Sequence, residues 1–316
     1  MNISALKPSA ALQTFRFSDL DQFRQAYRRV EVQFTPTCAR ISAEQAILSL
    51  PDSEIYLLHT FPRLLDAVVG NNSTFISLTM DDSFRVRING FEKESPGMVL
   101  GLSGAGYKMI EYPGSKFATA VFNHEITNRG WPVSGNALSL LSISAESQQR
   151  LRETLRAAFE FASERPDEFS VPGAALGVQE SILAAVDAAV ATSHNEDIRR
   201  AVTSSRYFIL AQKIEQIMAA NLNRPIYSEE LASELGVSVR TLHNATLRFR
   251  GMSLHRYLRL KRLWAVRRQL IAGGQQIKTC AIANGFWHLG EFAALYAGHF
   301  GETPSQTLAR SRYGLA

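Results

Sequence analysis

Cysteine is scarce in this chain. Only Cys38 and Cys280 occur among 316 residues, far apart and in no spacing that a metal site uses. Histidine is also sparse in the first 205 residues, which hold His59, His124 and His194. We therefore expect no metal ion, and the low cysteine content indicates a reducing, cytoplasmic location.

Long apolar runs are missing as well. No uninterrupted stretch reaches the roughly 18 residues that a membrane-spanning helix needs. The N-terminus lacks a basic start followed by an apolar run, so the sequence predicts neither a membrane segment nor a secretion signal. Apolar residues still make up 46% of the chain and charged residues 20%, which allows two domains with proper cores and argues against global disorder.

Complete catalytic motifs are also lacking. The segment GLSGAG resembles a nucleophile elbow, but the G-x-S-x-G motif requires glycine at Ala105, and we interpret it as a tight turn between strands. The segment HEITN begins like a zinc-binding H-E-x-x-H motif, but Asn128 stands in place of the second histidine. Gly104 and Gly106 lack the third glycine of a dinucleotide-binding loop. We therefore expect no enzyme activity and no cofactor.

Acidic residues are absent from one long segment of the C-terminal half. Ser238–Arg268 contains nine Lys/Arg and no Asp or Glu. Residues 206–316 hold 15 Lys/Arg and 6 Asp/Glu, whereas residues 1–205 hold 19 and 23, so a net charge of +5 hides a basic and a mildly acidic part. Charge of one sign favours a phosphate backbone, through Coulomb attraction and counterion release. An unevenly charged solvated surface is the alternative interpretation.

Hydrophobic periodicity changes along the chain. At 10–125, short apolar runs are separated by Asp-Asp, Asn-Gly and Pro-Gly pairs, which predicts a mainly antiparallel β barrel or sandwich. Flanking helices are predicted at 144–163 and 177–191. The sequence therefore predicts an α+β chain with a first domain at 1–192, a polar linker at 193–205 and an all-α domain at 206–316.

Two helix pairs in the all-α domain share one spacing. The first has Ala232 before a turn at Gly236, and the second has Ala281 before a turn at Gly285. Leu242, Gly251 and Ser253 follow the first turn glycine at the same spacings as Phe292, Gly301 and Thr303 follow the second, except that each spacing in the second pair is one residue longer. The second turn is therefore expected to be one residue longer. A small residue, a turn glycine and a large apolar residue in the following helix are typical of a helix-turn-helix. We therefore predict two such units.

A long helix is predicted between the two pairs. Residues 253–270 are apolar on several faces, as in a helix that is buried on several sides. It suits a rigid connector, because two recognition helices must enter successive major grooves about 34 Å apart. Within the first pair, Ser228 and Ser238 are the predicted helix N-caps. Trp264 and Trp287 are predicted to lie in the core.

The C-terminal region resembles the DNA-binding domain of the AraC/XylS family of transcriptional regulators. The resemblance lies in LASELGVSVRTLHNATLRFRGMSLHRYLRLKRLWAVRRQL and GFWHLGEFAALYAGHFGETPSQTL. GFWHLG, followed by Phe292, Tyr296, Phe300 and Pro304, is similar to a subset that includes the ethanolamine-operon and benzoate-type regulators. The resemblance implies two helix-turn-helix units joined by a long helix, and an N-terminal domain for effector sensing or dimerisation.

The resemblance also assigns the first DNA-contacting residues. Arg240, His243 and Asn244 occupy base-facing positions of the first recognition helix. Arginine can bind guanine, and asparagine adenine, through paired hydrogen bonds. Phosphate contacts position a protein on DNA without reading its sequence. The predicted phosphate contacts are Ser238, Thr241, Arg248, Arg250 and Lys261.

The second unit is less suited to reading bases. His288, Gly290 and Glu291 fall in its reading segment. The sequence departs from the family here, where arginine or glutamine is common near Glu291 and arginine at Ala294. A carboxylate accepts a hydrogen bond from cytosine N4 but repels phosphate. We therefore expect the first unit to dominate sequence specificity.

Three classes of function are compatible with these features. A sequence-specific transcriptional regulator, expected to be an activator at tandem sites near a promoter, is favoured by the duplicated helix pairs. A non-specific architectural DNA binder would bind unrelated DNA with equal affinity, and an enzyme with a basic nucleic-acid tether would carry an intact catalytic constellation. The expected partners are double-stranded DNA, RNA polymerase, a small-molecule effector and a second copy of the chain in a homodimer. Four aromatic residues of the sheet region could line an effector pocket, namely Phe75, Phe84, Tyr107 and Tyr112. The preferred interpretation is that they are ordinary core residues.

Overall fold

The computed structural model describes residues 1–26, 30–81, 86–93, 97–132, 138–171, 173–195, 206–221, 224–273 and 276–312. The chain divides into two compact units, which we call the sheet unit and the helical unit. The sheet unit comprises Met1–Phe34, Ser42–Arg87 and Glu92–Ala201, and the helical unit comprises Thr35–Ile41, Ile88–Phe91 and Val202–Ala316. The predicted linker at 193–205 lies outside the described residues from position 196 onward.

Two antiparallel sheets account for the β structure, as the short apolar runs predicted. One sheet has eight strands in the order β1-β3-β4-β11-β6-β9-β12-β13, and the other has five in the order β2-β5-β10-β7-β8. Both orders are open, so the described strands form no closed barrel. The strands are β1 Leu12–Phe17, β2 Val30–Pro36, β3 Ala43–Ser49, β4 Ser53–His59, β5 Arg63–Val69, β6 Thr74–Thr79, β7 Val86–Ile88, β8 Phe91–Lys93, β9 Gly97–Leu102, β10 Gly106–Glu111, β11 Lys116–Phe122, β12 Ser139–Ser142 and β13 His194–Asn195.

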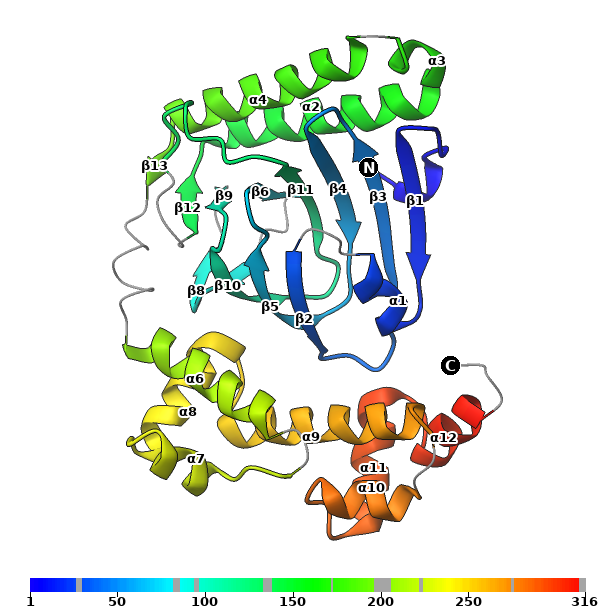
Figure 1. Cartoon of the computed structure of the whole chain (residues 1–316), viewed down its shortest axis with the longest axis vertical. Helices are drawn as coiled ribbons and strands as arrows, with labels where there is room; N and C mark the ends of the chain where they lie inside the picture. The colour runs from blue at the N-terminus through cyan, green and yellow to red at the C-terminus, as the bar shows by residue number, and fades with distance from the viewer. Residues whose placement is uncertain are drawn as a thin grey trace. The chain divides into compact units, whose positions relative to one another are not determined.

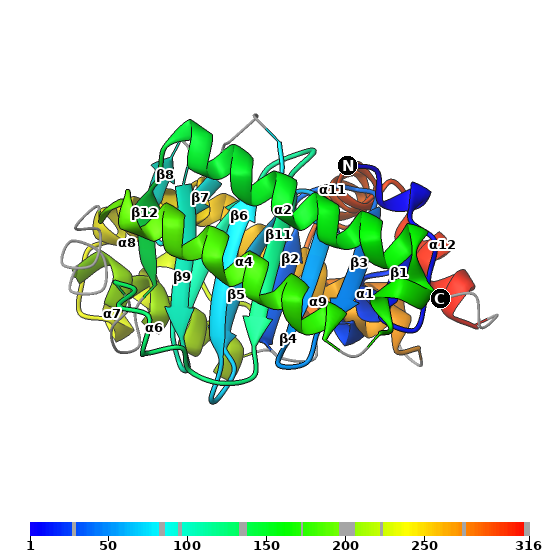
Figure 2. The same cartoon turned by 90° about the horizontal axis from the view of Figure 1, so that it is seen from above.

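Two long helices cover one face of the eight-stranded sheet (Figures 1 and 2). They are α2 (Ala145–Glu164) and α4 (Ala174–Ala191), joined by the short α3 (Pro166–Phe169). The hydroxyl of Ser144 caps α2 by accepting a hydrogen bond from the Ser147 amide at 3.0 Å. The apolar stripe of α2, formed by Leu151, Leu155, Ala158 and Ala162, is buried in the core with side chains of the strands, and the predicted helix at 144–163 is confirmed.

The two sheets contact each other through aromatic side chains. Phe75 on β6 and Tyr107 on β10 are buried, with ring centroids 5.6 Å apart. Plain core packing therefore accounts for both aromatics. Of the other two pocket candidates, Tyr112 is half-buried and Phe84 lies outside the described residues.

Helix α4 is long and strongly apolar. By length and composition alone Ala174–Ala191 qualifies as a membrane span, with a mean hydropathy of 1.4. The helix contains no uninterrupted apolar run of this length, because Glu180 and Asp187 divide it. Asp187 accepts a hydrogen bond from Trp131 Nε1 at 2.7 Å, and the apolar side of α4 belongs to the core of the sheet unit. A core helix of a folded domain passes the same hydropathy test.

The helical unit is built from seven described helices. Its core cluster contains Leu210, Leu231, Leu242 and Leu258, which come from four different helices. The connector predicted at 253–270 is a continuous helix with buried side chains on several faces, as its composition indicated. The helices are α6 Arg206–Ala220, α7 Ser228–Glu234, α8 Val239–Arg250, α9 Leu254–Ile271, α10 Ile277–Ala283, α11 Leu289–Phe300 and α12 Pro304–Arg312. The sheet unit also contains the short η1 (Ile3–Ala5) and α1 (Leu20–Gln25).

Candidate nucleic-acid interface

The two predicted pairs, α7–α8 and α10–α11, have the same turn. In each, the amide of the turn glycine donates to the carbonyl three residues earlier, at 3.2 Å for Gly236 and 2.9 Å for Gly285. The next amide donates to the carbonyl five residues earlier, at 3.0 and 2.9 Å. Both glycines have left-handed backbones, with φ of +63° and +77°. Glycine adopts this conformation without the steric cost that a Cβ imposes, which explains the recurrence in the sequence.

The second helix of each pair has the same length and the same end. Both α8 and α11 contain 12 residues. They stop at Gly251 and Gly301, whose φ angles are +66° and +69°. The segment between the paired helices covers residues 235–238 in the first pair and 284–288 in the second. The extra residue predicted from the spacing is therefore present.

Ser238 is the N-cap of α8, as predicted. Its hydroxyl oxygen accepts a hydrogen bond from the Thr241 amide at 3.1 Å. The expectation for Ser228 is wrong, because α7 starts at Ser228 itself and its N-cap is Tyr227, which makes no capping hydrogen bond through its side chain. A serine inside the first turn cannot satisfy the amides that an N-cap serves.

The two serines provide a matched test. Ser238→Ala is expected to lower the free energy of unfolding of the helical unit by about 1 kcal/mol, because the amide of Thr241 loses its acceptor. Ser228→Ala is expected to change it by no more than about 0.5 kcal/mol, as a surface substitution. Urea unfolding of both variants, followed by circular dichroism, measures the difference. Equal losses would contradict the assignment of the cap.

The candidate base-reading side chains of the first pair project outward. Arg240, His243 and Asn244 are all exposed on α8. Residues three and four positions apart lie on one side of a helix, so the three share one face. Leu242 and Ala245 are fully buried on the opposite side and hold the helix on its core. The helix therefore presents donors suited to guanine and adenine to solvent.

Thr246 is a polar residue on the inner side of α8. It is buried, and its hydroxyl donates to the Leu242 carbonyl at 2.8 Å, so its polar atom is satisfied within the helix. Phe249 is also buried and its ring packs against that of Phe208 at 5.8 Å between centroids. Phe249 thus supplies apolar volume on this side of α8.

Two of the five candidate phosphate contacts belong to an internal network around Glu215 of α6. The Arg250 guanidinium lies 2.6 Å from the Glu215 carboxylate and its side chain is only 3% exposed. Lys261 Nζ lies 3.2 Å from the same carboxylate, and the Tyr257 hydroxyl donates to it as well. The structure thus places Arg250 inside the helical unit, away from any surface on which a phosphate would lie.

The other three candidates lie nearer to solvent. Ser238 is exposed, and Thr241 and Arg248 are half-buried. All three belong to α8 or its cap, on the same helix as Arg240. A phosphate that approaches the start of α8 would also meet the positive end of the helix dipole.

The second pair presents an apolar surface at the start of α11. His288, Gly290 and Glu291 are exposed there, as expected for a reading segment. Trp287 is 65% exposed and Leu289 37% exposed. The prediction that Trp287 lies in the core is wrong, because the preceding residue in the turn takes the inward position, whereas the prediction for Trp264 on α9 is confirmed.

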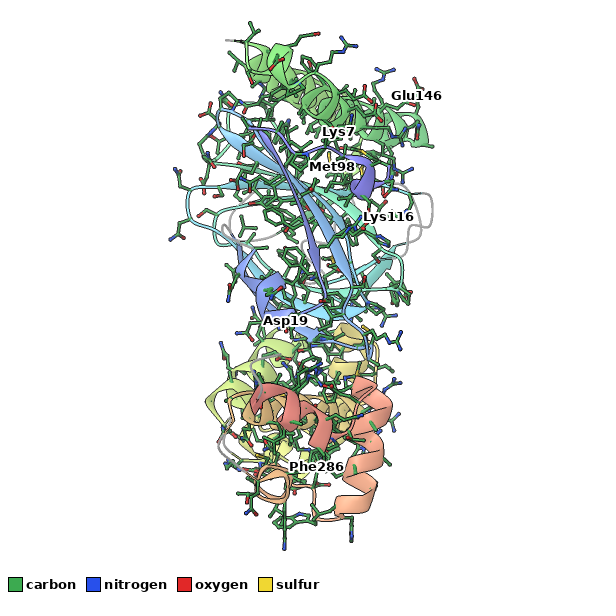
Figure 3. The ribbon with its side chains drawn as sticks, turned by 90° about the vertical axis from the view of Figure 1, so that its right-hand side faces the viewer. Lys7, Asp19, Met98, Lys116, Glu146 and Phe286 are labelled. Atoms are coloured by element: carbon green, nitrogen blue, oxygen red, sulfur yellow. The ribbon has the colours of Figure 1, made fainter. Side chains whose placement is uncertain are left out.

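Phe286, labelled in Figure 3, is that inward residue, and it packs on the half-buried Arg262. The Arg262 guanidinium of α9 lies 5.3 Å from the Phe286 ring and 5.7 Å from the Tyr227 ring, and Nη1 donates to the Gly285 carbonyl at 3.4 Å. Burial lowers the pKa of Arg262 from its ordinary value, and the nearby Arg259 lowers it further. Arg262 thus joins the start of α7 to the turn of the second pair. Local sequence gave no signal of this junction, because its parts are distant along the chain.

Comparisons with known proteins agree with this geometry. Residues 231–310 match a family model described as a helix-turn-helix domain, which covers both pairs except the first three residues of α7. The chain is 34% identical over 108 residues to the XylDLEGF operon transcriptional activator of Pseudomonas putida, which covers 33% of this chain and 34% of the relative. It is also 34% identical over 101 residues to the XylDLEGF operon transcriptional activator 2 of the same organism, covering 31% and 64%.

Two solved structures overlap more loosely. An AraC-type DNA-binding domain protein from Chromobacterium violaceum is 26% identical, with 33% of this chain and 92% of that chain covered and a TM-score of 0.31. The AraC-like transcriptional activator CuxR is 15% identical, with 80% and 94% covered and a TM-score of 0.41. At TM-scores below 0.5 these overlaps establish no shared fold.

Residues 231–310 therefore form a helix-turn-helix domain. The curated relatives similar to this region are transcriptional activators rather than enzymes. The match spans about a third of the length of the first of these relatives. The narrower resemblance to the ethanolamine-operon subset stays a prediction.

Proposed function

We propose that this chain is a sequence-specific DNA-binding transcriptional regulator whose two helix pairs enter tandem major-groove half-sites near a promoter. One observation carries the proposal: the exposed face of α8 presents Arg240, His243 and Asn244 within a helix pair whose geometry recurs at α10–α11. The excess of basic residues in 206–316 supports attraction to DNA. A repeated unit with base-reading donors favours sequence recognition over architectural binding.

The network around Glu215 reduces the number of residues that we propose to contact DNA. Arg240, His243 and Asn244 read bases, and the phosphate contacts are Ser238, Thr241 and Arg248. Arg250 and Lys261 are assigned to the Glu215 network instead. The paired guanidinium of Arg250 is almost fully buried and so is not available to a phosphate, and the half-buried Lys261 is paired with the same carboxylate. In the second pair, Trp287 and Leu289 join His288, Gly290 and Glu291, since apolar side chains can contact the thymine methyl group.

The remaining parts of the proposal follow from the relatives. The similar proteins are transcriptional activators, so we propose that this chain also activates transcription, by recruiting RNA polymerase in the cytoplasm. Residues 1–192 are proposed to sense an effector or to dimerise, and residues 206–316 to bind DNA.

Selection of duplexes from a random DNA library by the full chain tests this function. We expect enrichment of a motif with two half-sites about one helical turn apart. The selected duplex should bind at least about 1,000-fold more tightly than unrelated DNA at physiological salt. Equal affinity for both would instead indicate a non-specific architectural binder.

Arg240→Ala is expected to weaken binding to the selected duplex by about 1–3 kcal/mol and to relax the preference at one base pair. The reason is the loss of a paired hydrogen bond to a base edge. Fluorescence anisotropy on the selected duplex and on its single-base variants measures both effects. Arg206→Ala, an exposed arginine at the start of α6, serves as the control. A loss that is the same on every DNA sequence would make Arg240 a phosphate contact.

A further inference from the structure

Three ionisable side chains form a row across neighbouring strands at one end of the eight-stranded sheet. Glu44 on β3 is in register with His59 on β4, and His59 is in register with Lys116 on β11. Residues directly opposite each other in antiparallel strands project from the same face of a sheet. Leu57, two residues before His59, shares that face and belongs to the core that α2 and α4 cover. We call Glu44, His59 and Lys116 the polar row.

The N-terminal turn η1 lies beside the polar row. Ile3 is 5% exposed and belongs to the same core as Leu57. The Ser4 hydroxyl donates a hydrogen bond to the Glu44 carboxylate at 2.5 Å, and the Asn2 side chain accepts from the Ser4 amide at 3.1 Å. The turn is therefore fastened to the glutamate end of the row. Lys116, at the other end, lies close to this turn in Figure 3.

A cavity of about 260 Å³ lies between the turn and the strands. The polar row supplies one part of its lining, and Ile3, Leu57 and Met80 supply apolar parts. Ligand sites in proteins combine such apolar lining with a few convergent polar groups. At this volume the cavity suits a ligand smaller than the drug-sized ones for which about 300–1,000 Å³ is typical.

The charges of the polar row are unequally satisfied. Glu44 accepts from Ser4, and its carboxylate lies 3.3 Å from Arg16 Nε. Across the part of the chain that the structure describes, the His59 ring and the Lys116 ammonium have no side-chain hydrogen bond and no ion pair. The Glu44 carboxylate is thus already neutralised by its neighbours, whereas the Lys116 ammonium is available to a ligand in the cavity.

We propose that this cavity binds a small organic carboxylate with an apolar body. The Lys116 ammonium and a ring N–H of His59 donate to the carboxylate, in charge-assisted hydrogen bonds that are stronger than neutral ones. The body of the ligand covers Leu57 and Met80 and removes apolar surface from water. A cationic amine is disfavoured, because the carboxylate of Glu44 already has its partners. This site lies in the sheet unit and does not depend on the proposed DNA binding.

Isothermal titration calorimetry of the full chain, without DNA, tests the proposal. The probes are hexanoate and phenylacetate, and the controls are hexan-1-ol and hexylamine, which have a similar apolar body but lack the carboxylate. We expect saturable binding of at least one carboxylate and binding of the controls that is weaker by about tenfold or more, as for the loss of one charge-assisted contact. Absence of carboxylate binding at millimolar concentration, or equal binding of hexan-1-ol, overturns the proposal.

Substitutions locate the site. Lys116→Met keeps most of the apolar stem and removes the charge, so it is expected to weaken carboxylate binding by about tenfold or more. Lys116→Arg should retain binding, and Lys7→Met, at an exposed lysine outside the cavity, should leave it unchanged. Retention in Lys116→Arg guards against an effect of misfolding, which circular dichroism also checks. Unchanged affinity in folded Lys116→Met overturns the assignment.

Discussion

Gly285→Ala is expected to lower the free energy of unfolding of the helical unit by about 2–5 kcal/mol. The φ of +77° lies in the left-handed region, where a Cβ costs about 1–2 kcal/mol. The added methyl would also lie 2.9 Å from Pro225 Cβ and 3.0 Å from both Arg262 Nη1 and Tyr227 Oη. Crowding of this kind costs about 1–3 kcal/mol more, because a packed region cannot relax fully.

Gly236→Ala is the matched control for this prediction. Gly236 is the turn glycine of the first pair, with φ of +63°, but a Cβ there would meet nothing within 4 Å. Its expected loss is therefore only the backbone cost of about 1–2 kcal/mol. Urea unfolding of both variants separates the cost of conformation from that of crowding. Equal losses in the two variants would show that the Arg262 junction is not tightly packed.

The same substitution tests the proposed arrangement on DNA. The Arg262 junction connects the start of α7 to the turn before α11, so a displacement of that turn alters the spacing of the two reading helices. With the proposed function, folded Gly285→Ala should bind a duplex with two half-sites more weakly than the unsubstituted chain. Its affinity should fall less on a duplex that retains only the first half-site. Gly236→Ala should not show this difference between the two duplexes.

Arg250→Met is expected to lower the free energy of unfolding by about 3 kcal/mol without changing the salt dependence of DNA binding. The guanidinium is almost fully buried against Glu215, and removal of one partner from a buried ion pair costs about 3–5 kcal/mol. We expect a loss at the lower end of this range, because Lys261 and Tyr257 still pair with the Glu215 carboxylate. Thermal unfolding measures the loss.

Arg248→Met is the comparison for Arg250→Met. Arg248 is only half-buried and lies on the α8 surface proposed to face DNA. Its substitution should reduce the slope of log K against log salt by about 1, as expected for one lost phosphate contact, with a smaller effect on stability. Anisotropy titrations at several salt concentrations compare the two variants below their melting temperatures. A reduced slope for Arg250→Met with unchanged stability would restore its assignment as a phosphate contact.

Local patterns predicted the parts of this fold that local interactions determine. The spacing around Gly236 and Gly285 predicted two turns of the same kind, because a left-handed backbone position selects glycine wherever it occurs. The alternation of short apolar runs predicted antiparallel strands, but not that they would form two open sheets. Sheet closure depends on which edges pair, and strand composition does not encode this.

The sequence did not reveal the surroundings of three residues, for different physical reasons. Arg250 stands in a basic segment, and nothing near it indicates that Glu215, 35 positions away, takes its charge. Ser228 has the right chemistry for an N-cap but stands one residue too late, and a sequence pattern locates a helix start only approximately. Trp287 follows Phe286, and the turn allows only one of two adjacent aromatic side chains to point inward.

The repeated turns have a consequence for how this domain can change over time. In both helix pairs, the residues that shape the turn and hold the second helix on its core are separate from those that face solvent. Leu242 and Phe292 are buried, whereas Arg240 and Glu291 are exposed. Mutations at the exposed positions can accumulate in one copy without unfolding either. With the proposed function, a duplicated unit of this kind lets one half keep an old DNA target while the other half acquires a new one.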